Sequence, residues 1–356
     1  MLVAGAGMAG LAAAVRLREL GRDVRVHEKG TRAGGSMLLS SGVIWRHRLW
    51  DDFRRECPGG DERLQRLVWE RLDEALEWLR SLGAPVVWEE TGNPLTVGKR
   101  FDPHGLAATL LGRLGGCVEL GSPFPEAHEL LLATGGFASS AALVERYVRP
   151  AAPLRLRANP WSTGDGLEHA LSRGAALTAG MDEFYGRNMP DTEWGESDFV
   201  RDSQLYARFA RIFDEDGVEF FAARDVSWSE TNVVQATARR RGARAYYLLG
   251  ADALGQRVRE RSVAELVEPA RIPLAELPFA PPPGVEVAAR VVASVTHTIG
   301  GLRVDERARV LDAHGVPVEG LHAAGVDAGG VATGGYASGL AQALVLGLTA
   351  AEDMAR

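Results

Sequence analysis

The N-terminal segment places three patterns next to one another within twenty residues. A short apolar run, Met1–Ala4, is followed at once by the glycine-rich hexapeptide Gly5–Gly10. The next ten residues, Leu11–Leu20, carry Ala, Leu, Val and Arg at helical spacing. Strand, glycine turn and helix in this order bind the pyrophosphate of a dinucleotide. We therefore predict a dinucleotide site here; a glycine-rich βα turn without a ligand is the alternative.

The residues of this turn have distinct predicted roles. Gly5 allows the tight turn, Gly7 lets backbone N–H groups approach the phosphates, and Gly10 lets the helix pack closely on the strand. The open N–H groups at the helix start and the helix macrodipole supply a positive end that attracts an anion.

A carboxylate follows the turn at the expected distance. Residues 23–27 indicate a second strand that ends at Glu28, 18 residues after Gly10. A dinucleotide-binding fold places an acidic residue about 20 residues on, where it binds the ribose 2′-OH. This spacing favours FAD or NAD over NADP.

Composition narrows the class of protein. The chain of 356 residues has room for about two domains, and its net charge of −7 gives no basic surface for nucleic acid. The two cysteines form no CxxC, haem or iron–sulfur pattern, so we expect no metal. Without a signal peptide or a long apolar run, we expect a cytoplasmic protein with no membrane span. The short first strand leaves open whether the native chain begins upstream.

The rest of the first half keeps an α/β pattern. Small and hydroxyl residues gather at 35–42, and residues 61–82 form a strongly amphipathic helical pattern. A second helix is predicted at 106–114 and a short strand at 117–120. Residues 129–134 indicate a buried parallel strand whose end opens on a ligand.

From about Met181 aromatic and acidic residues become dense and the α/β rhythm is lost. It returns after residue 290, with apolar strands at 291–298 and 321–325 and a helix from 338 to about 354. We predict an α/β fold with a Rossmann-like FAD-binding domain formed by 1–178 and 296–356. A smaller α+β capping domain is expected at 179–295.

Several segments together resemble the flavoproteins of the fumarate reductase and succinate dehydrogenase superfamily, which includes 3-ketosteroid dehydrogenases. The segments, in the family's order, are VAGAGMAGLAAAVRL with Glu28, GGSMLLSSGVIW, LLATGGF, STGDGLEHAL, THTIGG and GLHAAGVDAGG…GGYASGLAQALVLG. Residues 180–290 match poorly. The chain is short for this family, and residues 120–131 are too few for the β-meander that its members usually insert there.

The resemblance implies an extended FAD. Members with covalent flavin carry a His where this chain reads Ser36–Leu39, so we expect non-covalent binding. The cofactor-binding residues implied by the turn and by the resemblance are Gly5, Gly7, Met8, Ala9, Gly10, Glu28, Lys29, Gly35, Ser36, Met37, Ser41, Gly42, Ala133, Thr134, Gly135, Asp165, Gly325, Asp327, Ser338, Gly339 and Leu340.

The catalytic half of the family pattern matches only in part. Fumarate reductases carry a carboxylate-binding Arg before the last helix, but this chain has no Arg between Arg309 and Arg356. The corresponding position holds Gly334 or Tyr336, depending on where a gap is placed. Bidentate recognition of a carboxylate is therefore missing there, which argues against a C4 dicarboxylate substrate.

The resemblance implies four candidate catalytic residues. His297 matches a substrate-binding His, with a structural His at a strand end as the alternative. Tyr336 and Tyr185 resemble tyrosines that polarise a carbonyl. Arg224 is the nearest match to the proton-donating Arg, and a surface residue fits it equally well.

We therefore expect an FAD-dependent oxidoreductase that forms or reduces a C–C double bond beside a carbonyl of a small-molecule substrate. Ketosteroids, enones and unsaturated acids are the candidate substrates. One alternative is a trimmed FAD-binding protein with little turnover, acting as an electron carrier or binding module. Another is a Rossmann protein that binds NAD without a flavin. The electron acceptor and any homo-oligomer stay open.

Overall fold

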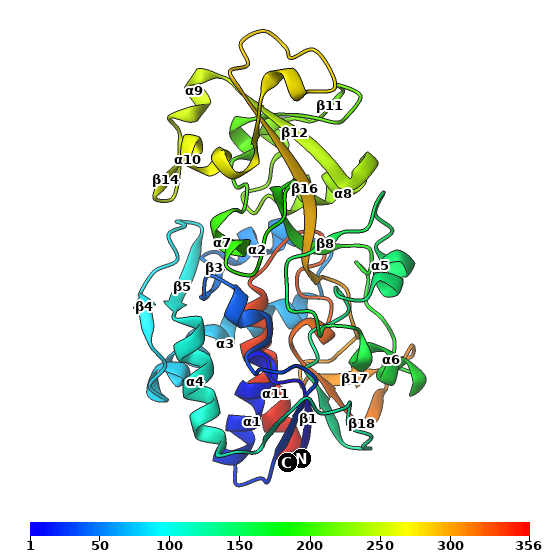
Figure 1. Cartoon of the computed structure of the whole chain (residues 1–356). Helices are drawn as coiled ribbons and strands as arrows, with labels where there is room; N and C mark the ends of the chain where they lie inside the picture. Colours follow the sequence, from blue (N-terminus) through cyan, green and yellow to red (C-terminus); the bar gives the residue numbers. More distant parts are fainter. The chain divides into compact units, whose positions relative to one another are not determined.

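A computed structural model describes residues 1–356, and Figure 1 shows the whole chain. The chain divides into two compact units. The first unit comprises Met1–Leu143, Asn159–Glu183 and His297–Arg356. The second comprises Val144–Ala158 and Phe184–Thr296.

The first unit is built on a six-stranded sheet in the order β17-β18-β7-β1-β2-β6. Its five parallel strands are β18 (Pro317–Ala323), β7 (Leu130–Leu132), β1 (Leu2–Ala4), β2 (Arg25–Glu28) and β6 (Val118–Leu120). Strand β17 (Arg309–Leu311) adds an antiparallel edge. The three leucines of β7 are fully buried, as a central parallel strand requires. The predicted Rossmann-like sheet is confirmed.

Six helices lie wholly within the first unit. They are α1 (Met8–Glu19), α2 (Trp50–Glu56), α3 (Glu62–Ser81), α4 (Pro103–Leu114), α6 (Asp165–Ser172) and α11 (Gly339–Met354), with the 3₁₀ turns η1 (Gly35–Leu39) and η7 (Gly325–Asp327). Helix α11 lies beside α1 (Figure 1). A methyl group at Gly347 would stand 2.6 Å from the Ala9 carbonyl oxygen, so the two helices meet backbone to backbone.

The first unit also contains a small antiparallel sheet. Its strands are β3 (Val43–His47), β5 (Thr96–Phe101) and β4 (Val86–Trp88), in that order across the sheet. Strand β3 follows the glycine-rich segment at 35–42. The sheet therefore carries Trp45 and His47 on the stretch of chain that leaves the predicted flavin site.

The second unit is built on a sheet with the central path β11-β10-β12-β16-β15, and β8 and β9 also pair with β16. The strands are β8 (Arg155–Leu156), β9 (Phe184–Pro190), β10 (Arg211–Phe213), β11 (Glu219–Phe221), β12 (Arg244–Leu249), β15 (Arg271–Ile272) and β16 (Val287–Thr298). Strands β13 (Arg257–Val258) and β14 (Arg261–Ser262) form a separate hairpin.

Short helices accompany these strands. They are α7 (Asp198–Arg201), α8 (Thr231–Ala238), α9 (Ala251–Leu254) and α10 (Val263–Val267), with η2 (Ala207–Phe209), η3 (Ala223–Asp225), η4 (Arg241–Ala243), η5 (Glu268–Ala270) and η6 (Leu274–Glu276). Helix α5 (Ala141–Tyr147) runs from the first unit into the second. None of the helices has both the length and the apolar character that a membrane span requires.

The two units differ from the predicted domains in three stretches. Residues 144–158 and Thr296, predicted for the FAD-binding domain, belong to the second unit, and residues 179–183, predicted for the capping domain, belong to the first. For residues 144–158 the reason is strand pairing and hydrogen bonding: Arg155 and Leu156 form β8 beside β16, and Ala151 N–H donates to the Ala238 carbonyl. These partners lie far away in the sequence, so no local pattern predicts the pairing.

Candidate functional site

The glycine turn between β1 and α1 is shaped by close backbone packing. Gly5 has a φ of 104°, and a methyl group there would lie 2.1 Å from the Ala133 carbonyl oxygen. A methyl group at Gly10 would lie 1.9 Å from the Gly5 carbonyl oxygen. Both positions therefore require glycine for the fold itself.

Gly7 differs, because a methyl group there would meet no protein atom within 4 Å. The backbone of Gly35 stands just opposite, since its own Cβ would lie 3.2 Å from Gly7 Cα. The N–H groups of Gly7, Met8 and Ala9 donate to no protein acceptor, although Met8 and Ala9 are buried. Open space beside unpaired N–H groups at a helix start fits a pyrophosphate.

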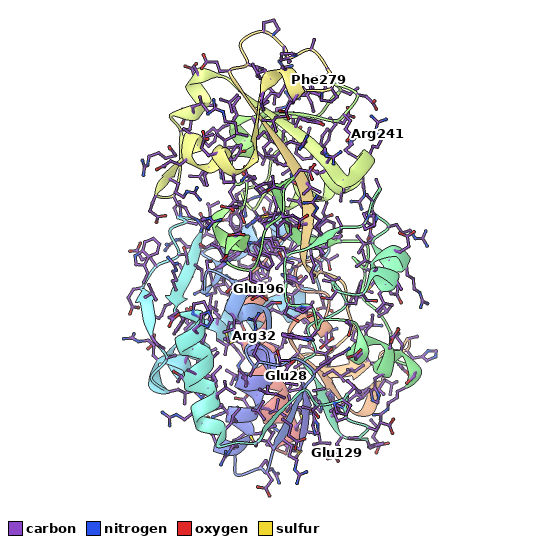
Figure 2. All side chains as sticks on the ribbon, in the orientation of Figure 1. Glu28, Arg32, Glu129, Glu196, Arg241 and Phe279 are labelled. Carbon is purple, nitrogen blue, oxygen red and sulfur yellow. The ribbon has the colours of Figure 1, made fainter.

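Glu28 ends β2 and holds the turn in place (Figure 2). Its Oε2 accepts from Ala6 N–H at 2.7 Å, and its Oε1 accepts from Gly30 N–H at 2.6 Å. The buried carboxylate thus stabilises the backbone on both sides of the strand end. Each oxygen keeps a second lone pair, so its predicted bond to a ribose hydroxyl is compatible with this geometry.

The next residue, Lys29, binds across to the turn before α6. Its Nζ donates to Thr163 Oγ1 at 2.6 Å and forms an ion pair with Asp165 at 2.9 Å. Trp161 of the same turn packs its ring on Gly30, where a Cβ would lie 2.6 Å from the ring. In the sequence this tryptophan appears only as part of a turn. No local pattern predicts that its ring lies beside Glu28.

The segment 35–42, which contains predicted cofactor-binding residues, is anchored from several sides. Ser36 Oγ accepts from Asn159 Nδ2 at 2.6 Å, and Met37 is buried within η1. The Ser41 carbonyl accepts from Arg100 Nε at 3.0 Å. Gly42 has a φ of 72°, and a methyl group there would lie 2.1 Å from the Phe101 carbonyl oxygen. The segment is therefore held in one path past Gly7.

Asp327 occupies a structural position at the end of β7. Its buried carboxylate accepts from the Thr134 N–H and from the N–H groups of Gly135 and Gly136 at 3.2 Å. Burial raises the pKa of Asp327, and these hydrogen bonds oppose the shift. Gly325 lies against Ala9, where its Cβ would come 3.2 Å from the Ala9 methyl group. The cofactor contacts predicted for Gly325 and Asp327 stay predictions.

The N-terminus of α11 forms a second place with open backbone donors. Ser338 caps the helix by accepting from Ala341 N–H at 3.3 Å. The N–H groups of Gly339 and Leu340 donate to no protein acceptor. Such a helix start stabilises negative charge on a ligand, which is compatible with the predicted cofactor-binding role of Ser338, Gly339 and Leu340.

His297 lies directly beside this helix start. A Cβ at Gly339 would come 3.1 Å from His297 Nε2, so the ring packs on the Gly339 backbone. Its Nδ1 lies 3.0 Å from the Thr298 carbonyl, which makes Nδ1 the proton-bearing nitrogen of a neutral ring. Burial lowers the pKa of His297. The structure thus places a neutral imidazole, with Nε2 as an acceptor, at the start of α11.

Tyr336 stands on the loop that leads into α11, three residues before Gly339. Its ring lies 5.7 Å from the ring of Trp45, centroid to centroid, at 60°. His297, Tyr336 and the start of α11 therefore belong to the same part of the first unit. Trp45 was not among the predicted site residues, because its apolar strand gave no sign of a tyrosine neighbour.

The other two candidate catalytic residues belong to the second unit. Tyr185 on β9 carries the Arg187 guanidinium over its ring, 4.8 Å from the centroid. Arg224 lies in η3 with its side chain 87% exposed and only a 3.9 Å ion pair to Asp225. This exposure favours the surface interpretation of Arg224 that the sequence left open.

Comparisons with solved structures show the fold. The chain aligns with a 3-ketosteroid Δ1-dehydrogenase from Sterolibacterium denitrificans at a TM-score of 0.73 and 17% identity, covering 99% of this chain and 98% of that one. A 3-ketosteroid Δ4-(5α)-dehydrogenase from Rhodococcus jostii gives 0.73 and 18%, covering 100% and 96%. A flavocytochrome c3 fumarate reductase gives 0.72 and 20%, covering 99% and 77%.

The sequence comparisons add the family. A search of curated proteins found no significant match. The family model described as "FAD binding domain" matches residues 1–116 and 121–340, which include the glycine turn, Glu28 and the start of α11. We call the open space at Gly7 the Gly7 cradle. This cradle and the unpaired N–H groups at the start of α1 fit the pyrophosphate of that cofactor. The chain therefore belongs to the FAD binding domain family, and its cofactor is FAD.

Proposed function

We propose that this protein is an FAD-dependent oxidoreductase that forms or reduces a C–C double bond beside a carbonyl group. The observation that carries the proposal is the packing of the His297 ring on Gly339 at the start of α11, with Tyr336 on the same loop. An imidazole acceptor and a phenol donor at an anion-stabilising helix start suit proton transfer next to a carbonyl.

The roles follow from the hydrogen-bonding capacity of each group. Bound FAD supplies the hydride acceptor or donor at N5. In the oxidising direction a protein base takes the α-proton, the β-hydrogen leaves as hydride, and the C–C double bond forms. The Tyr336 hydroxyl donates to the substrate carbonyl and stabilises the enolate, while neutral His297 accepts a hydrogen bond or the proton at Nε2. Tyr185 and Arg224 stay sequence-based candidates.

The surroundings of Tyr336 favour an uncharged, flat substrate. The loop and helix from Gly330 to Ala355 contain no Arg or Lys, so no side chain there can form a bidentate carboxylate pair. The Trp45 ring instead lies beside Tyr336. Aromatic rings of this kind stack on planar apolar molecules. We therefore favour cyclic ketones and enones, ketosteroids among them, over C4 dicarboxylates.

The test is anaerobic mixing of the FAD-loaded protein with a panel of ketosteroids, cyclic enones and unsaturated acids. Oxidised flavin absorbance should fall, or chemically reduced flavin should reoxidise, with a cyclic ketone or enone. His297→Ala and Tyr336→Phe should slow this step by about 10²–10⁴-fold, as for lost general acid–base groups. His104→Ala, at an exposed histidine on α4, is the matched control.

A second function is favoured by the exposure of Arg224 and the missing carboxylate-binding Arg. In that case the protein carries electrons on FAD without efficient turnover. No flavin change with any panel member, together with parent-like His297→Ala and Tyr336→Phe variants, would support this carrier over the oxidoreductase.

We also propose non-covalent FAD. The segment Ser36–Leu39 offers no His, Cys or Tyr as an attachment point. Acid precipitation should release the yellow cofactor into the supernatant, whereas flavin that stays with the pellet would contradict non-covalent binding.

A further inference from the structure

The loop that carries Tyr336 is bound along its length by a distant segment of the same unit. We call residues 330–337 the Tyr336 loop. Asp61 N–H donates to the Gly330 carbonyl at 2.7 Å, and Gly59 N–H donates to the Thr333 carbonyl at 3.1 Å. The side chain of Gln65 donates to the Val331 carbonyl at 2.8 Å. The segment 56–65 thus lies along the Tyr336 loop and hydrogen-bonds its backbone.

Contact becomes closest next to Tyr336 itself. A methyl group at Gly335 would lie 1.8 Å from the Glu56 carbonyl oxygen and 3.4 Å from Cys57 Sγ. Gly334 N–H donates to Glu183 Oε2 at 2.7 Å. The peptide between Gly335 and Tyr336 therefore lies directly against Cys57.

The backbone of Tyr336 lies close enough to two buried side chains to shift their pKa values. It raises the pKa of the His47 imidazole against the larger effect of burial, and it lowers the pKa of the Cys57 thiol, again against burial. Together with the close approach of Cys57 Sγ to Gly335, this places His47 and Cys57 next to the same residue.

Burial keeps both side chains in their neutral forms. His47 is 2% exposed, and burial lowers its pKa to about 4. Cys57 is fully buried, and burial raises the pKa of its thiol. At neutral pH the pair therefore offers a neutral N–H donor and a sulfur acceptor, and places no charge beside the loop.

Aromatic packing extends this arrangement to the Tyr336 ring. The His47 ring stacks on Phe53 at 5.2 Å and 26°. Trp45 meets the His47 ring edge-on at 5.3 Å and meets Tyr336 at 5.7 Å. The His47 ring thus contacts the tryptophan that lies beside the Tyr336 ring.

We propose that His47 and Cys57 are positioning residues, which fix the Tyr336 backbone so that its phenol meets the substrate carbonyl in one orientation. This inference rests on the proposed function only for its catalytic consequence. The positioning itself is a property of the folded protein, and it can be measured without turnover.

The first experiment measures amide hydrogen exchange of the FAD-loaded protein in peptides that cover residues 329–338. His47→Phe and Cys57→Ala should speed exchange in this segment by about five- to tenfold, the effect of losing one hydrogen bond. His47→Asn, which keeps a donor near the Nδ1 position, and Cys57→Ser, which keeps an acceptor, should restore most of the protection. Cys117→Ala, at the partly buried second cysteine, is the matched control.

The second experiment is a kinetic double-mutant cycle on the substrate found in the panel. His47→Phe should lower kcat about tenfold with little change in KM. In the Tyr336→Phe background it should cost nothing further, because the group it positions is gone.

The outcomes separate the two proposals. Unchanged exchange in both His47→Phe and Cys57→Ala would overturn the positioning role, and so would additive losses of kcat in the cycle. If His47→Phe or Cys57→Ala fails to fold, parent-like protection in the Asn and Ser variants supports the role, and lost protection in both overturns it. Faster loop exchange without turnover of any ketone would reject the proposed reaction and keep the positioning.

Discussion

Glu28 Oε2 accepts a hydrogen bond from the Ala6 N–H at 2.7 Å, which ties the end of β2 to the glycine turn after β1. The same carboxylate accepts from Gly30 N–H through its other oxygen. A residue predicted as a ribose ligand therefore also shapes the turn that would hold the pyrophosphate. The carboxylate should consequently matter to both folding and cofactor affinity.

Glu28→Gln tests this double role. An amide group cannot accept from both N–H groups, so one buried donor loses its partner at a cost of about 1–3 kcal/mol. The variant should melt at a lower temperature without FAD and should bind FAD at least tenfold more weakly by flavin fluorescence titration. Glu129→Gln, at an exposed glutamate (Figure 2), is the control. Unaltered stability together with unaltered affinity would contradict both roles.

Gly7→Ala and Gly10→Ala should have opposite signatures. A methyl group at Gly7 meets no protein atom and the residue has a φ of −79°, so the variant should fold normally. It should lose FAD affinity, because that methyl group would occupy the cradle. Gly10→Ala should be destabilised by several kcal/mol even without FAD, because its methyl group would overlap the Gly5 carbonyl. Thermal melts of the apo variants distinguish the two, and normal FAD binding by Gly7→Ala would argue against the cradle.

Trp161 should contribute to FAD binding although it lies outside the glycine turn. Its ring covers Gly30 beside Glu28, where the adenosine end of the cofactor is expected. Base–aromatic stacking is worth about 1–3 kcal/mol, so Trp161→Ala should weaken FAD binding by about five- to a hundredfold. Calorimetric titration measures this, with Trp88→Ala on the exposed strand β4 as control. Equal affinities of the two variants would remove Trp161 from the site.

Glu230 should make the stability of the protein depend on pH. Its side chain is buried, with 3% exposed, and its backbone φ is 57°. Burial raises the pKa of Glu230 from 4.5 to about 7, whereas Arg187, Arg208 and the Ala207 N–H act to lower it. Between these values the folded protein holds a proton that the unfolded chain has released. The free energy of unfolding therefore falls as the pH rises from 4.5 to 7, by about 3 kcal/mol.

Glu230→Gln removes this titration. Urea unfolding of the variant and the parent should show a stability difference that grows in favour of the variant from pH 4.5 to 7. A difference that is constant across this range would show that the carboxyl group titrates normally.

Periodic and local features were predictable from the sequence. The amphipathic pattern at 61–82 became α3 at Glu62–Ser81, capped by Asp61, and the apolar run before Thr134 became the buried strand β7. The glycine turn was predictable because its three glycines stand together in the sequence and Gly10 packs on the Gly5 carbonyl.

Long-range partners were not predictable. Asp327 binds the 134–136 turn across more than 190 residues, and nothing around it in the sequence distinguishes such a carboxylate from a cofactor ligand. His47 and Cys57 reach Tyr336 only because α2 and the segment after it lie along the loop before α11.

The most direct measurement is the rate of anaerobic flavin reduction by a cyclic ketone and by the same ketone with deuterium at its β-carbon. Carbon–hydrogen cleavage at that position predicts loss of oxidised flavin absorbance, slower with the deuterated substrate and slower again in Tyr336→Phe. Flavin that stays oxidised with every ketone, and reduced flavin that stays reduced with every enone, would contradict the proposed reaction.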